Sequence, residues 1–200
     1  MPVGVPRVPY QHPDPEIEFA SWLDLYNRLY RERILFLGQE INCNISNQLV
    51  SVLLYLNLKP EIKDIFFFIN SPGGWVVPGF ALFDAMQTNK SNVKTICFGL
   101  AASMGSFLLT GGAPTKRVAF PHARIMMHQP ANSYYAGQTG EFSLESQELL
   151  KFREIIINVY VEKTRRSARI ISKDIDRDIF MSSLEALFYG IVDLVGLDID

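Results

Sequence analysis

Ser103 is the residue whose surroundings point most directly to chemistry. It lies in the uncharged stretch FGLAASMGSFLLTGG at residues 98–112. The pattern predicts a buried strand before it and a helix after it that ends at Gly111-Gly112. Such a turn of small residues exposes a hydroxyl and leaves backbone N–H groups free at the helix start. AASMG matches the G-x-S-x-G nucleophile motif only in part, because Ala101 replaces the first glycine. Ser103 is therefore a candidate nucleophile, and a structural serine in a close-packed turn is the alternative.

A serine nucleophile needs a histidine base, and the order of the residues along the chain limits the choice. No Asp or Glu lies between Ser103 and His128, which excludes a Ser–Asp–His order. Orders that place the histidine first have only His12, in a proline-rich segment. The remaining order is Ser–His–Asp, with His122 or His128 as the base. We favour His128, because it follows the predicted strand RIMM and a side chain at a strand end can face a cleft.

The second glycine-rich turn, SPGG at 71–74, follows the apolar run DIFFFIN. Glycines allow backbone N–H groups to approach a ligand closely. An N–H of Gly73 or Gly74, together with the N–H of Met104, would form a two-donor oxyanion hole. A tight strand-to-helix turn without a ligand is the alternative for this segment alone.

Composition excludes several classes of function. The chain has 200 residues, enough for one domain, and a net charge of −2, which gives no electrostatic basis for binding nucleic acid or an anionic membrane. No metal-ligand spacing and no ATP-binding G-x-x-x-x-G-K-[ST] motif is present. Glycine, serine and proline interrupt the uncharged residues 95–115, so we expect a soluble protein. We expect Cys43 and Cys97 to be small buried thiols rather than a disulfide.

Apolar periodicity predicts alternating strands and helices, and hence one α/β domain with right-handed crossovers. Strands are expected at 34–41, 64–70 and 94–100, with one or two more in 116–130. Helices are expected at 21–33 with Ser21 as cap, at 47–58 with Ser46 as cap, at 76–89, directly after Ser103 up to Gly111-Gly112, and at 141–164. The strand at 64–70 is apolar enough for a sheet covered on both faces.

Both ends of this pattern have distinctive segments. Five of the eleven prolines fall in the first fifteen residues, so we expect residues 1–18 to form a flexible, extended arm without a secretory or transit signal. The helix at 141–164 carries apolar residues over most of its circumference, and such a helix needs burial on several sides. An internal helix and a helix that contacts another subunit both satisfy this pattern.

Four linked motifs carry a family resemblance: INSPGG at 69–74, GLAASMGSFLL at 99–109, ARIMMHQP at 123–130 and RDIFMS at 177–182. In order and spacing they resemble the Clp protease proteolytic subunit, from about Leu25 to Val195. The resemblance implies a crotonase-like α/β fold of repeated β-α units. It also implies a single serine peptidase domain at 19–200, with a protruding handle at about 131–164 that includes the Gly137-Gln138 pair.

The resemblance also assigns residues to roles. It implies that Ser103 is the nucleophile, His128 the general base and Asp178 the acid, where spacing alone leaves Asp174 and Asp176 equally eligible. The backbone N–H groups of Gly74 and Met104 match the oxyanion positions of the family. No metal or other cofactor is implied. The implied reaction is hydrolysis of peptide bonds in unfolded proteins.

The family implies partners as well. Its members form two stacked heptameric rings, which receive unfolded substrates from a hexameric AAA+ chaperone ATPase; this fits the missing ATP motif. Four aromatic residues match positions that receive the loops of the chaperone, although core packing is the alternative for them: Phe66, Phe68, Phe98 and Phe120.

Within the family, MPVGVPRVPY, WLDLYNRLYRERILFLGQEI and TGEFSLESQELLKFRE resemble the plastid-encoded subunit of chloroplasts. This similarity implies the chloroplast stroma, with a bacterial cytoplasm as the alternative. The usual Thr-Gly after the long helix is Thr164-Arg165 here. Three other functions stay open: a non-catalytic subunit of a mixed ring, a crotonase-type acyl-CoA enzyme, and a peptide-binding module.

Overall fold

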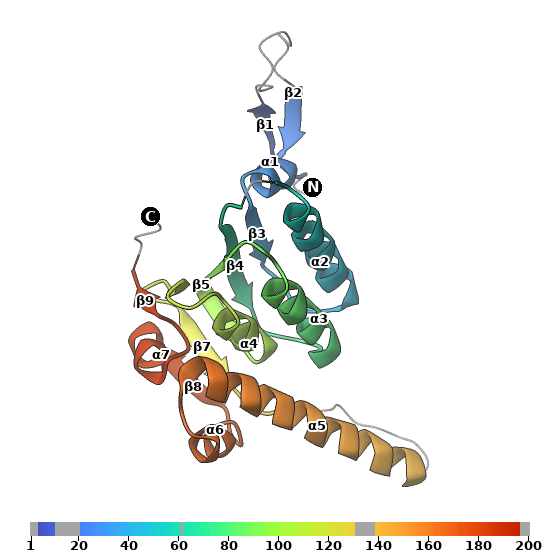
Figure 1. The fold of residues 1–200 in the computed structure, drawn as a ribbon, viewed down its shortest axis with the longest axis vertical. Helices are drawn as coiled ribbons and strands as arrows, with labels where there is room; N and C mark the ends of the chain where they lie inside the picture. The colour runs from blue at the N-terminus through green and yellow to red at the C-terminus, as the bar shows by residue number, and fades with distance from the viewer. Residues whose placement is uncertain (1–3, 11–20, 61, 131–138, 197–200) are drawn as a thin grey trace.

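The structure is a computed structural model, which describes residues 4–10, 21–60, 62–130 and 139–196 (Figure 1). His12, the Gly137-Gln138 pair, much of the predicted arm and the start of the predicted handle lie outside the described residues. Near the amino terminus, β1 (Arg7–Tyr10) and β2 (Ser21–Asp24) pair as a small antiparallel sheet that projects from the rest of the molecule.

The main sheet has a parallel path in the order β3-β4-β5-β6-β9. These strands are β3 (Ile34–Leu37), β4 (Ile65–Ser71), β5 (Val93–Ala102), β6 (Arg117–Ala119) and β9 (Leu194–Val195). The long strand β5 serves two partners. Its first half pairs with β6, and beyond Gly99 (φ +78°) its second half pairs in parallel with β7 (Arg124–Met127). β8 (Ile179–Ser182) then pairs antiparallel with β7. The carboxyl ends of β5 and β7 therefore lie next to each other.

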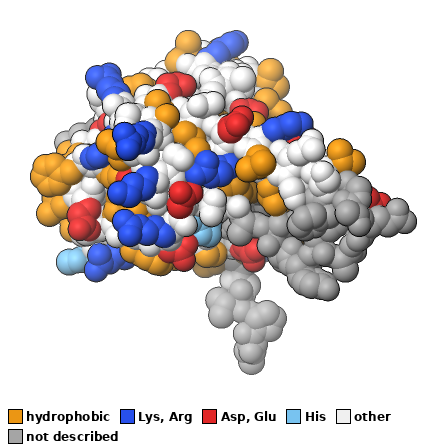
Figure 2. Space-filling model, turned by 90° about the horizontal axis from the view of Figure 1, so that it is seen from below, with side chains coloured by type: hydrophobic (Ala, Val, Ile, Leu, Met, Phe, Trp, Pro, Cys, Tyr) orange, Lys and Arg blue, Asp and Glu red, His pale blue; other side chains and the backbone are white. Residues whose placement is uncertain are grey.

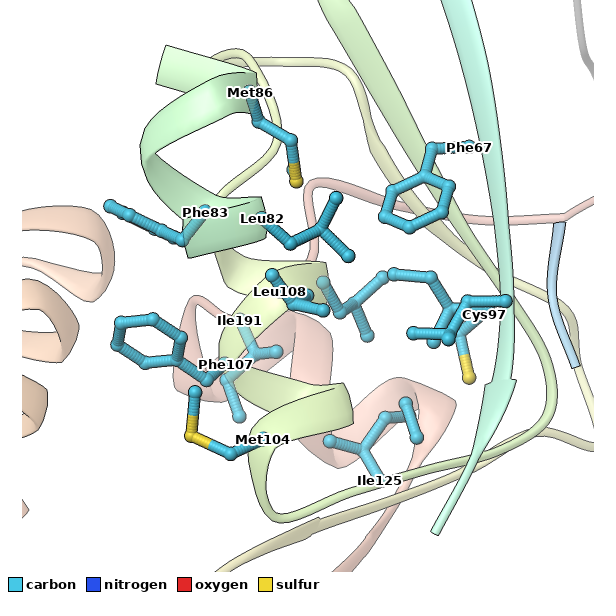
Figure 3. Packing of buried hydrophobic residues seen from close by; sticks show 14 of the residues in the cluster. Phe67, Leu82, Phe83, Met86, Cys97, Met104, Phe107, Leu108, Ile125 and Ile191 are labelled. Atoms are coloured by element: carbon cyan, nitrogen blue, oxygen red, sulfur yellow. The ribbon is translucent and has the colours of Figure 1, made fainter. Parts of the chain in front are cut away.

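Helices α2 (Cys43–Asn57), α3 (Val76–Gln87) and α4 (Met104–Thr110) lie on one face of this sheet (Figure 1). Figure 3 shows how the core forms between these layers: Leu82 of α3 and Leu108 of α4 pack toward Phe67 of β4 and Cys97 of β5. The other helices are α1 (Leu25–Arg31), α5 (Thr139–Thr164), α6 (Ala168–Asp174) and α7 (Ser183–Tyr189). The long helix α5 reaches well beyond the sheet.

The predicted alternation of strands and helices is confirmed, but two predicted helix starts are wrong. Residues 21–24 form β2 rather than the first turn of a helix, and Asp24, not Ser21, caps α1 by accepting from the N–H of Asn27 at 2.9 Å. Asn42, not Ser46, caps α2. Ser46 lies buried inside that helix and donates its hydroxyl to the carbonyl of Pro78 at 2.6 Å.

The expectations for β4 and for the cysteines are each half right. Alternate residues of β4, including Phe67, are buried toward the helices, whereas Phe66 and Phe68 are only half-buried on the opposite face. Cys97 is a buried free thiol as expected, but Cys43 is exposed, because it occupies the first turn of α2. None of the described helices is long and apolar enough to cross a membrane.

The substitution after the long helix has a clear structural consequence. Arg165 follows α5 directly and adopts φ +59°, while its N–H donates to the carbonyl of Val161 at 2.9 Å. This left-handed position at a helix end favours glycine, because a side chain with Cβ is strained there. Helix α5 therefore ends with the left-handed backbone conformation that is common after helices, but an arginine rather than a glycine adopts it.

Candidate active site

Ser103 occupies a sharp junction between β5 and α4. Its backbone has φ 54° and ψ −122°, a conformation that non-glycine residues rarely adopt. Hydrogen bonds hold both sides of the residue in place. Its N–H donates to the carbonyl of Met126 at 2.9 Å, and its carbonyl accepts from the N–H of Phe107 at 3.1 Å. Strained backbone that the surroundings fix in this way is typical of functional sites.

His128 follows the last residue of β7, and Asp178 precedes the first residue of β8. Because Met127 pairs with Ile179 in the antiparallel ladder, the next pair across it is His128 and Asp178. The Nδ1 atom of His128 lies 3.1 Å from Oδ1 of Asp178. The imidazole is 29% exposed and the carboxylate 64%. The sheet register thus aligns one ring nitrogen with a carboxylate, while the other ring nitrogen has no hydrogen bond within the described part of the chain.

The two competing acids have other partners. Asp174 accepts a hydrogen bond from the hydroxyl of Tyr189 at 2.7 Å. Asp176 forms an ion pair with Arg153 of α5 at 2.7 Å. Of the three aspartates that spacing left eligible, Asp178 is therefore the one that contacts His128.

Ser103 and His128 line the same small pocket. Its other lining residues are mostly apolar and come from α3, α4, α5 and the segment after β7: Val76, Met104, Phe107, Pro130, Ile156 and Tyr160. Among the described residues, no hydrogen bond joins Ser103 to His128, and catalytic hydrogen bonds are often loose without substrate. His122, the other candidate base, is exposed and precedes β7, at the end opposite His128.

The SPGG turn packs directly against Ser103. A Cβ atom on Gly73 (φ +96°) would come within 2.7 Å of Cβ of Ser103, so only glycine permits this approach. A Cβ atom on Gly74 (φ +146°) would lie 2.2 Å from the carbonyl oxygen of Ile41. Neither the N–H of Gly74 nor that of Met104 has an acceptor among the described residues. The described residues therefore leave two backbone donors without acceptors, one in the nucleophile turn and one next to Gly73, which packs on it.

The described residues contain no group of three or more His, Cys, Asp or Glu side chains that could hold a metal ion.

Charged side chains of both signs occur on the face seen from below, where Lys and Arg gather on one half with acidic residues among them (Figure 2). Near Ser103, burial raises the pKa of Tyr160 far above its ordinary value, so this phenol stays protonated. The donors and acceptors present suit acyl transfer to a serine hydroxyl.

Comparison with known proteins agrees with this arrangement. The family model for Clp protease matches residues 17–198. The chain belongs to the Clp protease family. The ATP-dependent Clp protease proteolytic subunit of Glycine max is 61% identical over 99% of this chain and its own full length. The proteins of that name from Lotus japonicus and Nicotiana tabacum are each 59% identical over the same shares. As a member of this family the chain is a serine-type endopeptidase, with the predicted α/β fold of Clp proteases.

The predicted docking residues fall into separate groups. Phe68 and Phe98 pack together at 6.0 Å between ring centroids, and both contact Phe36, which sequence reasoning missed. Phe66 lies beside the ammonium group of Lys94, 5.5 Å from its ring centroid. Phe120 is half-buried and packs against the core. Phe36 and Phe98 also line a groove whose other wall is α1.

Two further residues near Ser103 were missed by sequence reasoning. Ser106 and Tyr160 are buried and hydrogen-bonded to each other at 2.8 Å, although they lie 54 positions apart. In the sequence both residues occupy ordinary interior positions of predicted helices, and no motif marked either of them as a site residue. Ser106 lies three residues after Ser103, but only packing in space connects Tyr160 with the nucleophile turn.

Proposed function

We propose that this Clp protease chain cleaves peptide bonds with Ser103, His128 and Asp178. Nε2 of His128 takes the proton of Ser103, and Oγ of Ser103 attacks the peptide carbonyl. The resulting imidazolium gives its proton to the leaving amine. Water then attacks the acyl-enzyme, with His128 as base, and regenerates Ser103. The contact of 3.1 Å between His128 and Asp178, beside the strained Ser103 turn, is the observation that carries this proposal.

The free N–H groups of Gly74 and Met104 would stabilise the oxyanion of each tetrahedral intermediate. Gly73, the neighbour of Gly74, packs on Ser103 and Met104, and neither N–H has another acceptor among the described residues; both observations support this role. The substrate class we propose is unfolded polypeptide.

We also propose a partner that supplies ATP hydrolysis. The relatives are named ATP-dependent, whereas this sequence has no P-loop motif, so the ATPase would be a separate chain. A hexameric AAA+ chaperone is the proposed partner. Its loops would contact the aromatic residues beside the groove at α1, Phe68 and Phe98, with Phe66 and Phe120 as further candidates.

The proposed assembly is a pair of stacked heptameric rings of this and related proteolytic subunits. Exposed apolar residues along α5, such as Leu144, Leu150 and Ile155, support burial of this helix against another subunit. The three relatives named above come from plants, which supports a plastid-type subunit in the chloroplast stroma. Residues 1–18 would form an axial arm outside the peptidase domain at 19–200.

Hydrolysis of a short fluorogenic peptide tests this function. We expect Ser103→Ala to lower turnover by roughly 10⁴- to 10⁶-fold, as in other serine triads, without a change in assembly. Near-normal turnover by this variant would exclude the proposed nucleophile. Turnover by the wild-type chain also excludes a non-catalytic subunit, and its inhibition by a serine-reactive phosphonate separates a peptidase from a crotonase-type acyl-CoA enzyme.

A further inference from the structure

A buried chain of hydroxyl groups connects helix α5 to the nucleophile turn. The side chain of Tyr160 is 2% exposed, and its hydroxyl lies 2.8 Å from Oγ of Ser106, which is fully buried. Oγ of Ser106 in turn lies 2.8 Å from the carbonyl oxygen of Ser103. Tyr160 of α5, Ser106 of α4 and the carbonyl of Ser103 therefore form one continuous path of hydrogen bonds that ends on the proposed nucleophile.

The direction of these hydrogen bonds follows from the number of protons. The carbonyl of Ser103 can only accept, so Ser106 uses its single hydroxyl proton to donate to it. Tyr160 must then donate to Oγ of Ser106. Burial raises the pKa of Tyr160, so its proton stays in place at any pH at which the protein works. Hydrogen bonds aligned in this way polarise and strengthen one another.

The end of this chain fixes a peptide plane that matters for the reaction. The carbonyl of Ser103 and the N–H of Met104 belong to the same planar peptide unit and point in opposite directions. The carbonyl accepts both from Ser106 and from the N–H of Phe107. Two anchors on the carbonyl therefore set the direction in which the N–H of Met104 points. Ser103 has a strained φ of 54°, and such a turn needs restraint to keep one orientation.

We propose that Tyr160 and Ser106 are positioning residues that aim the N–H of Met104 at the oxyanion. This inference rests on the proposed function, because it assumes that Ser103 is the nucleophile and that Met104 supplies an oxyanion donor. Neither side chain reacts with the substrate in this role. Their effect reaches the transition state through the peptide between Ser103 and Met104.

Tyr160→Phe tests the inference, because it keeps the ring that lines the pocket and removes only the donating hydroxyl. Ser106→Ala removes the middle of the chain, and the double variant removes both partners so that no buried hydroxyl is left unpaired. Thr95→Val is the matched control. Its buried hydroxyl bonds the carbonyl of Leu109 at the opposite end of α4, at 2.7 Å, away from Ser103.

Three quantities are measured for each variant: kcat and KM for a fluorogenic peptide, and the affinity for a peptide boronic acid. The boronic acid forms a tetrahedral adduct with the serine and so reports on the oxyanion donors. We expect Tyr160→Phe and Ser106→Ala each to lower kcat and boronate affinity about five- to tenfold, with KM within about twofold of wild type. The double variant should lose no more than either single variant, and Thr95→Val should lower only Tm.

Tyr160→Phe and Ser106→Ala could instead keep the kcat and boronate affinity of wild type and lose only Tm, as is expected of Thr95→Val. That result would show that the hydrogen bonds from Tyr160 to Ser103 are an ordinary core contact. A raised KM at constant kcat would instead place Tyr160 in substrate binding and would also overturn the inference. Ser103→Ala is assayed in parallel. If that variant stayed active, the proposed function itself would fail, whereas an inactive Ser103→Ala beside normal positioning variants rejects this inference alone.

Discussion

Nδ1 of His128 and Oδ1 of Asp178 lie 3.1 Å apart, at the point where β7 ends and β8 begins. The register of an antiparallel pair sets this contact, since Met127 faces Ile179 one position earlier. A carboxylate at Nδ1 fixes the tautomer that leaves Nε2 unprotonated, and it stabilises the imidazolium that forms during acyl transfer. The arrangement therefore depends on the sheet rather than on a loop.

The first prediction concerns this contact. Asp178→Asn should lower kcat about 10²- to 10⁴-fold with little change in KM, because the amide favours the wrong tautomer of His128. The loss falls below that of a fully buried triad acid, since the carboxylate is 64% exposed. Peptidase kinetics measure the effect, and Asp174→Asn, which affects only the bond from Tyr189, is the control. A larger loss in the control than in Asp178→Asn would move the acid to Asp174.

A second prediction concerns Arg153 of α5. Its guanidinium donates to Asp176 at 2.7 Å and to Oγ of Ser172 at 3.0 Å, and it reaches Gln129, next to His128, at 3.3 Å. It thus holds together the two segments that carry His128 and Asp178.

Arg153→Met should therefore lower kcat about threefold to thirtyfold and reduce Tm by a few degrees. Arg169→Met is the matched control, because Arg169 is exposed on α6. Steady-state kinetics and thermal unfolding measure both variants. Equal activity of the two would show that the segments keep their positions without Arg153.

A third prediction follows from the left-handed backbone of Arg165. Arg165→Gly should stabilise the protein by about 0.5–1 kcal/mol, because glycine adopts φ +59° without strain, although it loses more entropy on folding. For a chain of this size the expected rise in Tm is about 1–4 °C at fixed protein concentration. Arg165→Ala keeps a Cβ atom and should bring no such gain. A Tm of the glycine variant at or below that of the alanine variant would contradict the argument from strain.

A fourth prediction concerns the two thiols. Burial raises the pKa of Cys97 to about 12, so almost none of it is thiolate at pH 8, whereas Cys43 is exposed. A thiol reagent should therefore label one cysteine per native chain at pH 8 and two in denaturant. Cys43→Ser should abolish the native labelling. Rapid labelling of Cys97 in the native protein would mean that the core around β5 opens readily.

Much of the fold could be predicted from the sequence, because the apolar runs at β4 and β5 and the small-residue turns that follow them are strong local signals. The helix starts were harder, since Asp24 and Asn42 compete with Ser21 and Ser46 as caps and local sequence does not decide between them. Ser46 instead donates to the carbonyl of Pro78, a contact across 32 positions. Such long-range contacts are set by packing.

The candidate site shows the same division. Ser103 and the SPGG turn could be singled out locally, because small residues between a strand and a helix expose a hydroxyl and backbone N–H groups, but a purely structural turn fits the same pattern. The choice among three aspartates could not be made from spacing, since Asp174, Asp176 and Asp178 lie within five positions and differ only in what the fold brings to them. The bond between Tyr160 and Ser106 carries no local signal, because it exists only after α5 packs on α4.

The most direct test of the central claim is to identify the residue that a fluorophosphonate modifies. After incubation of the assembled protein with the probe, peptide mass spectrometry should find one adduct, on Ser103. His128→Ala should slow labelling by at least about 100-fold, and Ser103→Ala should abolish it. An adduct on another serine, or peptide hydrolysis that persists while Ser103 remains unmodified, would contradict the assignment of Ser103 as the nucleophile.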